Sequence, residues 1–284
     1  MKPPAFDYVK PASVAEALVL LAECADSCKI LAGGQSLVPA MNFRLARPDI
    51  LIDINDLREL DYIGSSADRL RIGALTRHAL FHRPVIESPL GVLLSKVVRH
   101  IAHYPIRQRG TFAGSVAHAD PASEWCLVAT TLGAEMVARS VRGERVIEAG
   151  AFFQGTFTTA LAVDELLVEI RLPLLGQGWQ TGFYEFSRRA GDFALGMAVA
   201  ALRIEDGTIR AAHLGVGGVG DRAVRLSALE QHLVGQPASL AIIDGIAREA
   251  RAMVEPSGDI HASPEYRRDL VATSVKRALT EALA

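Results

Sequence analysis

The sequence predicts an α+β fold of two domains, the second of which is smaller and built from antiparallel strands followed by helices. At 284 residues the chain exceeds the usual size of a single hydrophobic core. Half of the residues are hydrophobic and the formal net charge is −2, which is typical of a compact globular protein. The second half reads as a run of strands and then a run of helices, not as the strand–helix alternation of a doubly wound sheet.

The domain boundary is predicted within Pro173–Gly178. This segment contains two glycines and few residues that could pack in a core. We therefore expect the first domain to cover residues 1–175 and the second to cover residues 178–284.

In the first half, Ser13 and Glu16 have the spacing of a capping box, which predicts a helix over 13–25. Asp120 before Pro121 predicts the start of another helix that runs to residue 132. The other elements expected here are strands at 29–31, 49–54, 70–75, 134–141, 145–149 and 164–172, a short helix capped by Thr76, a helix over 89–101 and a loop over 104–118.

The second half is expected to contain strands near 181–187, 194–204 and 208–216, and helices near 226–234, 238–253 and 264–282. Its most apolar stretch, Phe193–Leu202, is about half as long as a membrane span and is interpreted as a buried strand. The N-terminus lacks the apolar run of a secretory signal, so we expect a cytoplasmic protein.

The cysteines do not suggest a redox centre of their own. Cys24, Cys28 and Cys126 are too few to hold an iron–sulfur cluster by four thiolates and too scattered for a disulfide framework. Cys24 and Cys28, four apart on the expected first helix, are interpreted as ordinary thiols.

Charge gives no reason to expect a nucleic-acid partner. The densest positive charges adjoin glycine-rich segments and do not form a long basic stripe, so they are interpreted as local contacts to an anion or a partner. These residues are Arg107, Arg109, Arg188 and Arg189.

Two glycine-containing loops are the strongest chemical signal. Ala32–Ser36 follows a strand, and adjacent glycines there let the backbone aim its N–H groups at an anion. Thr111–Ser115 is a second loop of small and hydroxyl-bearing residues. Together the loops could bind a diphosphate from both sides, with the hydroxyls of Ser36, Thr111 and Ser115 adding hydrogen bonds.

Ala32–Ser36 together with Thr111–Glu124 resemble the paired FAD-binding motifs of the flavoprotein medium subunit of molybdenum hydroxylases. This is the family of the carbon monoxide dehydrogenase medium chain and the FAD domain of xanthine dehydrogenase. The similarity covers nearly the whole chain. It includes Phe6–Tyr8, Asp49–Asn55, Glu165–Leu167, Arg188–Ala194, and Gly215–Gly218 with Arg225 beyond it.

The resemblance implies that the first domain is a two-part FAD-binding domain. The two loops would wrap the FAD diphosphate, Glu124 would accept hydrogen bonds from the ribose hydroxyls, Leu167 would approach the flavin through its backbone, and Arg188 or Asp192 would lie near the isoalloxazine. The complete set of implied FAD-binding residues is Lys29, Ile30, Leu31, Ala32, Gly33, Gly34, Gln35, Ser36, Ala102, Thr111, Ala113, Gly114, Ser115, Glu124, Leu167, Arg188 and Asp192. No residue is expected to be catalytic or to bind a metal.

Two positions depart from the family pattern. Ala113 stands where the second loop usually has a glycine, which narrows the loop slightly. Phe186 and Ser187 occupy the neighbourhood in which the family often has a lysine, so the role of that lysine does not pass to Arg188.

Other candidate residues have structural interpretations. His118 is a loop histidine with no partner visible in the sequence, and His100 and His103 flank a helix end, where metal binding is not expected. Gly215–Gly220 superficially matches a dinucleotide-binding fingerprint, but no crossover helix follows it, so we expect a strand and a turn.

The function implied by the resemblance is that of one subunit in an oxidoreductase. A large partner would carry the molybdenum cofactor and a small partner two [2Fe-2S] clusters, in a dimer of heterotrimers, and FAD on this chain would take the electrons and pass them to an external acceptor. Two alternatives stay open: a self-contained flavin-dependent oxidase and a flavin-free interaction module.

Overall fold

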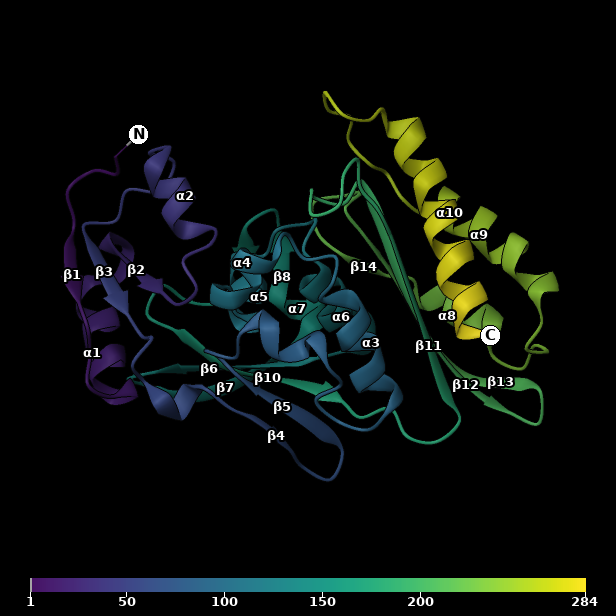
Figure 1. Ribbon diagram of the computed structural model, residues 1–284, viewed down its shortest axis with the longest axis horizontal. Coiled ribbons are helices and arrows are strands. Elements are labelled where there is room, and N and C mark those ends of the chain that lie inside the picture. Colours follow the sequence, from purple (N-terminus) through teal and green to yellow (C-terminus); the bar gives the residue numbers. More distant parts are fainter. Residues whose placement is uncertain (1) are drawn as a thin grey trace.

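The computed structural model describes residues 2–284 and confirms the α+β class: helices and strands are mixed in the first half, and a run of strands is followed by helices in the second (Figure 1). Three sheets carry the architecture: a parallel sheet in the order β1-β3-β2, an antiparallel sheet in the order β4-β5-β10-β6-β7, and an antiparallel sheet in the order β11-β12-β13-β14. A two-stranded ribbon, β8-β9, completes the fold.

The small parallel sheet lies at the N-terminal end of the molecule. It consists of β1 (Asp7–Val9), β2 (Cys28–Leu31) and β3 (Ile50–Asp53), with α1 (Val14–Cys24) connecting the first two strands and α2 (Leu37–Asn42) following the second. Ser13 caps α1 as expected, because its hydroxyl accepts a hydrogen bond from the Glu16 N–H.

The five-stranded sheet forms the floor beneath the central helices (Figure 1). Its strands are β4 (Ile63–Ser65), β5 (Arg69–Gly73), β6 (Glu135–Ser140), β7 (Gly143–Glu148) and β10 (Leu166–Pro173). The helices in the same half of the chain as this sheet are α3 (Pro89–Val97), α4 (Tyr104–Arg109), α5 (Phe112–His118), α6 (Glu124–Leu132) and α7 (Ala149–Phe152). Short 3-10 turns occur at Ala25–Ser27, Arg58–Leu60 and His78–His82. The ribbon pairs β8 (Phe153–Gly155) with β9 (Thr158–Thr159).

The C-terminal sheet is covered on both faces. Its strands are β11 (Trp179–Phe186), β12 (Gly196–Glu205), β13 (Thr208–Gly217) and β14 (Val224–Arg225), and its helices are α8 (Ser227–Leu233), α9 (Ile243–Ala252) and α10 (Pro264–Ala282), with a 3-10 turn at Leu240–Ile242 before α9. Helix α10 packs against β11 and β12, whereas α3 and α6 of the first half pack against β11, β12 and β13. The two halves are therefore joined through a shared apolar interface, which includes Phe183 of β11.

Three local expectations were wrong. The segment 104–118, expected to be a loop, contains α4 and α5, because Thr111 caps α5 by accepting from the Gly114 N–H at 2.9 Å. The helix expected from Asp120 begins at Glu124, since Asp120 instead accepts from the Ala122 N–H in a turn and Ser123 is the cap. Thr76 caps no helix; its hydroxyl donates to the Tyr62 carbonyl.

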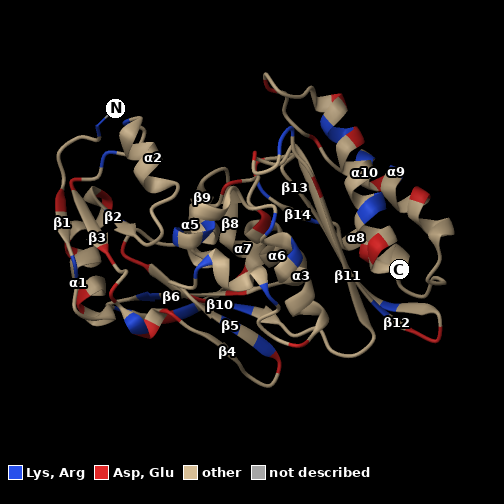
Figure 2. Ribbon diagram, viewed as in Figure 1, with Lys and Arg blue, Asp and Glu red and all other residues tan. Residues whose placement is uncertain are grey.

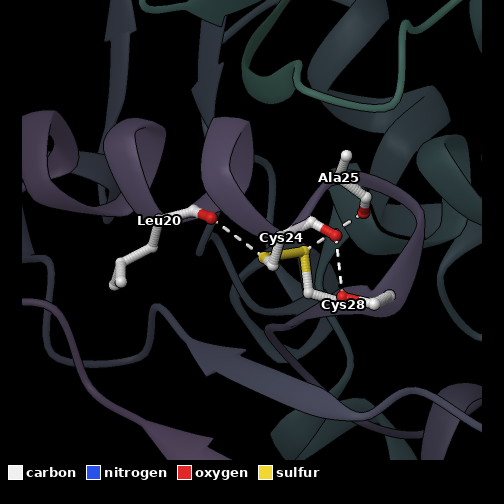
Figure 3. Close-up of a disulfide and its surroundings, with 5 residues drawn as sticks. Leu20, Cys24, Ala25 and Cys28 are labelled. Atoms are coloured by element: carbon white, nitrogen blue, oxygen red, sulfur yellow. Dashed lines mark hydrogen bonds between the residues drawn. A yellow bond between two sulfur atoms is a disulfide. The ribbon is translucent and has the colours of Figure 1, made fainter.

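The interpretation of Cys24 and Cys28 as ordinary thiols was also wrong, because the structure pairs them as a disulfide (Figure 3). Helix α1 ends at Cys24, and the following 3-10 turn reverses the chain so that the two Cα atoms lie 5.6 Å apart. Cys126 is buried as a free thiol.

Basic and acidic residues are interspersed along both halves of the chain (Figure 2). Ion pairs link α9 to α10, as in Arg251 with Asp269 and Lys276 with Asp244. Such exposed pairs contribute little stability each. Among residues 2–284, no helix is both long and apolar enough to span a bilayer.

Candidate cofactor-binding site

The first glycine-containing loop touches the backbone of Arg109–Gly110, which leads directly into the second loop. A Cβ atom placed on Gly33 would lie 2.6 Å from the carbonyl oxygen of Arg109 and 2.7 Å from the Cα of Gly110. A Cβ on Gly110 would in turn lie 2.6 Å from Nε2 of His78. The approach of the first loop is possible only without a side chain at Gly33, and a side chain at Gly110 would instead displace His78, so the first loop lies directly against the segment that leads into the second.

The first loop presents free backbone donors. Gly34 has a φ of +72°, which L-residues with side chains rarely adopt, and it turns the chain from β2 into α2. Within residues 2–284, the N–H groups of Gly34, Gln35 and Ser36 have no hydrogen-bond partner. Three consecutive unpaired N–H groups at a tight turn are suited to binding an anionic group.

A polar clamp of Asn55 and Arg77 connects the two loops. The Asn55 amide donates to the Ala32 carbonyl at 2.8 Å, and its side-chain oxygen accepts from Arg77 at 2.5 Å. The guanidinium of Arg77 also donates to the carbonyl of Arg109. The clamp thus fixes the first loop against the start of the second.

Aromatic packing supports the second loop from below. Phe112 stacks on Trp125, with ring centroids 4.5 Å apart, and the Trp125 indole donates to Nδ1 of His78 at 3.0 Å. Burial and the nearby charges of Arg107 and Arg77 lower the pKa of His78 to about 3, so this side chain is neutral and can accept the bond.

Glu124 lies on the first turn of α6, as expected. It is half-buried, and its carboxylate accepts no hydrogen bond from any described side chain. Burial, reinforced by the charge of Asp120, raises the pKa of Glu124 to about 7. A carboxylate in this condition would gain from hydroxyl donors supplied by a ligand.

The segments around Ala102 and Arg188–Asp192 lie against one another. Gly191 has a φ of +84°, and a Cβ on it would lie 2.4 Å from Cε1 of His103 and 3.0 Å from the Ala102 carbonyl oxygen. Arg188 and Asp192 form only a loose pair at 3.9 Å and remain available to a ligand. The turn Arg188–Asp192 of the second half therefore packs on the Ala102–His103 segment of the first half.

Leu167 is buried in β10, where the pairing with β6 shifts register between Leu167 and Glu169. Helix α5 packs on this strand. Lys29 has an exposed side chain in β2, so only its backbone is shared with the loop that follows.

The structure thus forms two groups of the predicted residues. The first loop lies next to the start of the second loop, and Ala102 lies next to the turn Arg188–Asp192. Sequence reasoning missed Asn55 and Arg77. The role of Asn55 could have been predicted from the sequence, because polar residues in the loop directly after a buried strand often contact ligands. Arg77 carried no such signal, because its role depends on the carbonyl of Arg109.

The remaining histidine and glycine interpretations are consistent with the structure. His118 ends α5 and stacks on Phe157, with ring centroids 4.8 Å apart. Gly215–Gly217 end β13, and Gly218, with a φ of +75°, makes the turn that follows and donates its N–H to the Pro121 carbonyl at 2.9 Å.

Two cavities lie elsewhere. One of about 610 Å³ is lined by residues of α3, β11 and α10, including Lys96, Tyr184 and Arg277; another of about 340 Å³ lies between the turn after β13 and residues 253–257. Neither is lined by the glycine-containing loops, so cavity size does not identify the cofactor site here.

Comparison with known proteins matches the chain over almost its full length. Residues 4–175 match the family model described as the FAD binding domain in molybdopterin dehydrogenase, and residues 181–282 match the CO dehydrogenase flavoprotein C-terminal domain. The caffeine dehydrogenase subunit beta of Pseudomonas sp. (strain CBB1) is 40% identical over 285 residues, covering 99% of this chain and 96% of that protein. The 6-hydroxypseudooxynicotine dehydrogenase complex subunit alpha of Paenarthrobacter nicotinovorans is 42% identical, covering 100% and 96%.

Solved structures match the fold over nearly the whole chain. A chain of quinoline 2-oxidoreductase from Pseudomonas putida 86 superposes with a TM-score of 0.94 at 37% identity, covering 100% of this chain and 98% of that one. A chain of carbon monoxide dehydrogenase from Hydrogenophaga pseudoflava gives a TM-score of 0.95 at 34% identity, covering 99% and 98%.

The close contact at Gly33 predicts a sensitive position. Gly33→Ala should separate the loops, weaken FAD binding by about tenfold or more, equivalent to about 1.4 kcal/mol or more, and destabilise the fold by about 1–3 kcal/mol. Fluorescence titration with FAD and urea unfolding measure the two effects. Gly150→Ala is the control, because nothing lies within 4 Å of its added Cβ; equal affinities of the two variants would contradict the contact.

The clamp predicts that substitutions of Arg77 and Asn55 have non-additive effects on FAD binding. Arg77→Met and Asn55→Ala should each weaken FAD binding by about tenfold, and the double variant should lose little more, because each change already breaks the link between the loops. Arg58→Met, at an exposed arginine whose side chain makes no hydrogen bond among the described residues, serves as the control. Additive losses in titrations of the four proteins would show that the two side chains act independently.

Proposed function

Because the chain belongs to the family of FAD-binding medium subunits of molybdenum hydroxylases, described by its matching model as the FAD binding domain in molybdopterin dehydrogenase, we propose that it relays electrons through FAD within such a complex. The resemblance seen in the two glycine-containing loops is confirmed by matches over both halves of the chain. The observation that carries the proposal is the joined pair of loops, which presents unpaired N–H groups beside the capped start of α5.

The residues present suit FAD. Gly34, Gln35 and Ser36 offer their N–H groups to the diphosphate, while the second loop, Thr111–Ser115, borders the same surface. Glu124 would accept from ribose hydroxyls, and the turn Arg188–Asp192 with Ala102 would lie beside the flavin end. Lys29, Ile30 and Leu31 hold the first loop through β2, and Leu167 would approach the flavin through its backbone at the register shift of β10.

FAD, when bound, supplies the two-electron redox chemistry, and the protein supplies binding, orientation and local electrostatics. The close backbone contact at Gly33 holds the first loop in place, and Arg77 keeps a positive charge beside the anion-binding surface. No side chain of this chain need act as an acid or base on a substrate.

The partners in this proposal are a small subunit with two [2Fe-2S] clusters and a large subunit with the molybdenum cofactor, arranged as a dimer of heterotrimers in the cytoplasm. Electrons would come from the small subunit and pass to an external acceptor. In support, the relatives named above are subunits of dehydrogenases, and the solved carbon monoxide dehydrogenase of Hydrogenophaga pseudoflava is described as a form that lacks the Mo-pyranopterin moiety of the molybdenum cofactor.

Isolation of the complex from its host tests this proposal. We expect flavin absorption bands, FAD released on heating at about one per chain, and iron and molybdenum that co-purify with the chain. Flavin without the two metals would favour a self-contained oxidase, and a colourless folded chain that takes up no added FAD would contradict the FAD site itself.

A further inference from the structure

Glu185 is a buried acid with an unpaired oxygen. It lies on β11 on the same face as Phe183, which belongs to the core shared with the first half. Its side chain is only 2% exposed, and its Oε2 has no hydrogen-bond partner among the described residues. An ionised carboxylate so enclosed is costly unless a cation or several donors surround it.

No cation is paired with Glu185 among the residues that the structure describes. From α3, His100 places Nδ1 3.9 Å from Oε2, beyond hydrogen-bond distance, and burial lowers the pKa of His100, so this imidazole is mainly neutral. Lys96 of the same helix is paired with Glu281 of α10. On β12, the residue opposite Glu185 is Met197, which carries no charge.

The other charged groups nearby do not neutralise it either. Arg277 of α10 lies over the ring of Tyr184, on the opposite face of β11. From α6, Glu124 faces Glu185 with a charge of the same sign. Arg107, which acts on Glu124, already donates to the carbonyls of Ile101 and Ala102.

We propose that Glu185 is a second carboxyl group of the FAD site, a positioning residue that keeps its proton and leaves Glu124 as the single charged acceptor for the ribose hydroxyls. This inference rests on the proposed FAD site. A buried carboxyl group and a half-buried one of like charge cannot both ionise cheaply, so the buried one holds its proton.

The direction of titration agrees with this geometry. Burial first, and then the charge of Glu124, raises the pKa of Glu185 to about 9, above that of Glu124. Glu124 therefore ionises first. Loss of the second proton would place another negative charge beside Glu124.

Glu185→Gln keeps the shape of the protonated acid and removes its ionisation. The dissociation constant of FAD is measured by fluorescence titration at about pH 7 and again at about pH 9.5. Between these two pH values it should rise about three- to tenfold more in the unmodified protein than in the Gln variant. Comparison of the two proteins removes any titration of FAD itself. Glu87→Gln, at an exposed glutamate without hydrogen bonds among the described residues, should behave like the unmodified protein.

The apoprotein provides a second readout that does not need FAD. Glu185 titrates at about 4.5 when unfolded and about 9 when folded, so the folded state binds the extra proton between these values. The stability that the protonated acid contributes is complete below the unfolded value and is lost as pH rises through the folded value. The melting temperature of the unmodified protein should thus fall, relative to the Gln variant, between about pH 5 and about pH 9.

The outcomes separate the two claims. If FAD binds but the unmodified protein and the Gln variant share one pH profile and one melting profile, Glu185 holds no such proton and the inference is wrong while the FAD site stands. The inference is also wrong if Glu185→Gln stays folded yet loses FAD at every pH, because Glu185 would then act as a charged ligand. If no FAD binds to the unmodified protein, both claims fail.

Discussion

The contact between the backbones of Gly33 and the Arg109–Gly110 segment is the constraint on which the site depends. It joins a loop that follows a parallel strand to a loop that begins a helix more than seventy residues later in the chain. Because no side chain can fit between them, the geometry is set by backbone packing and not by adaptable rotamers. Asn55 and Arg77 then hold the contact with hydrogen bonds to carbonyls on both sides.

The second half of the chain completes the surface. Gly191 packs on His103, Gly218 donates to the Pro121 carbonyl, and Arg267 of α10 donates to the carbonyls of Leu195 and Gly218. The Gly191 contact and the Gly218 hydrogen bond hold these turns against the first half, and Arg267 ties the segments before β12 and after β13 to α10. A cofactor bound across both halves would therefore meet a prearranged surface, which reduces the entropy lost on binding.

Most strands and long helices could be predicted from local signals, such as the continuous apolar run of β12 and the Ser263–Pro264 start of α10. The short helices α4 and α5 could not, since six or seven residues give too little periodicity and only the Thr111 cap reveals the second. The disulfide was missed because the helix pattern before Cys24 does not show that the chain reverses there. The glycine loops were visible as motifs, but their contact, the Arg77 clamp and the buried state of Glu185 depend on tertiary packing that no local pattern encodes.

Hydrogen exchange of the chain with and without FAD tests most directly whether the two loops act as one cofactor-binding unit. If they do, the amides of residues 33–37 and of residues 110–116 become protected together on addition of FAD, and Gly33→Ala reduces protection in both segments. Protection confined to one loop, or protection that appears only elsewhere in the chain, would contradict the account.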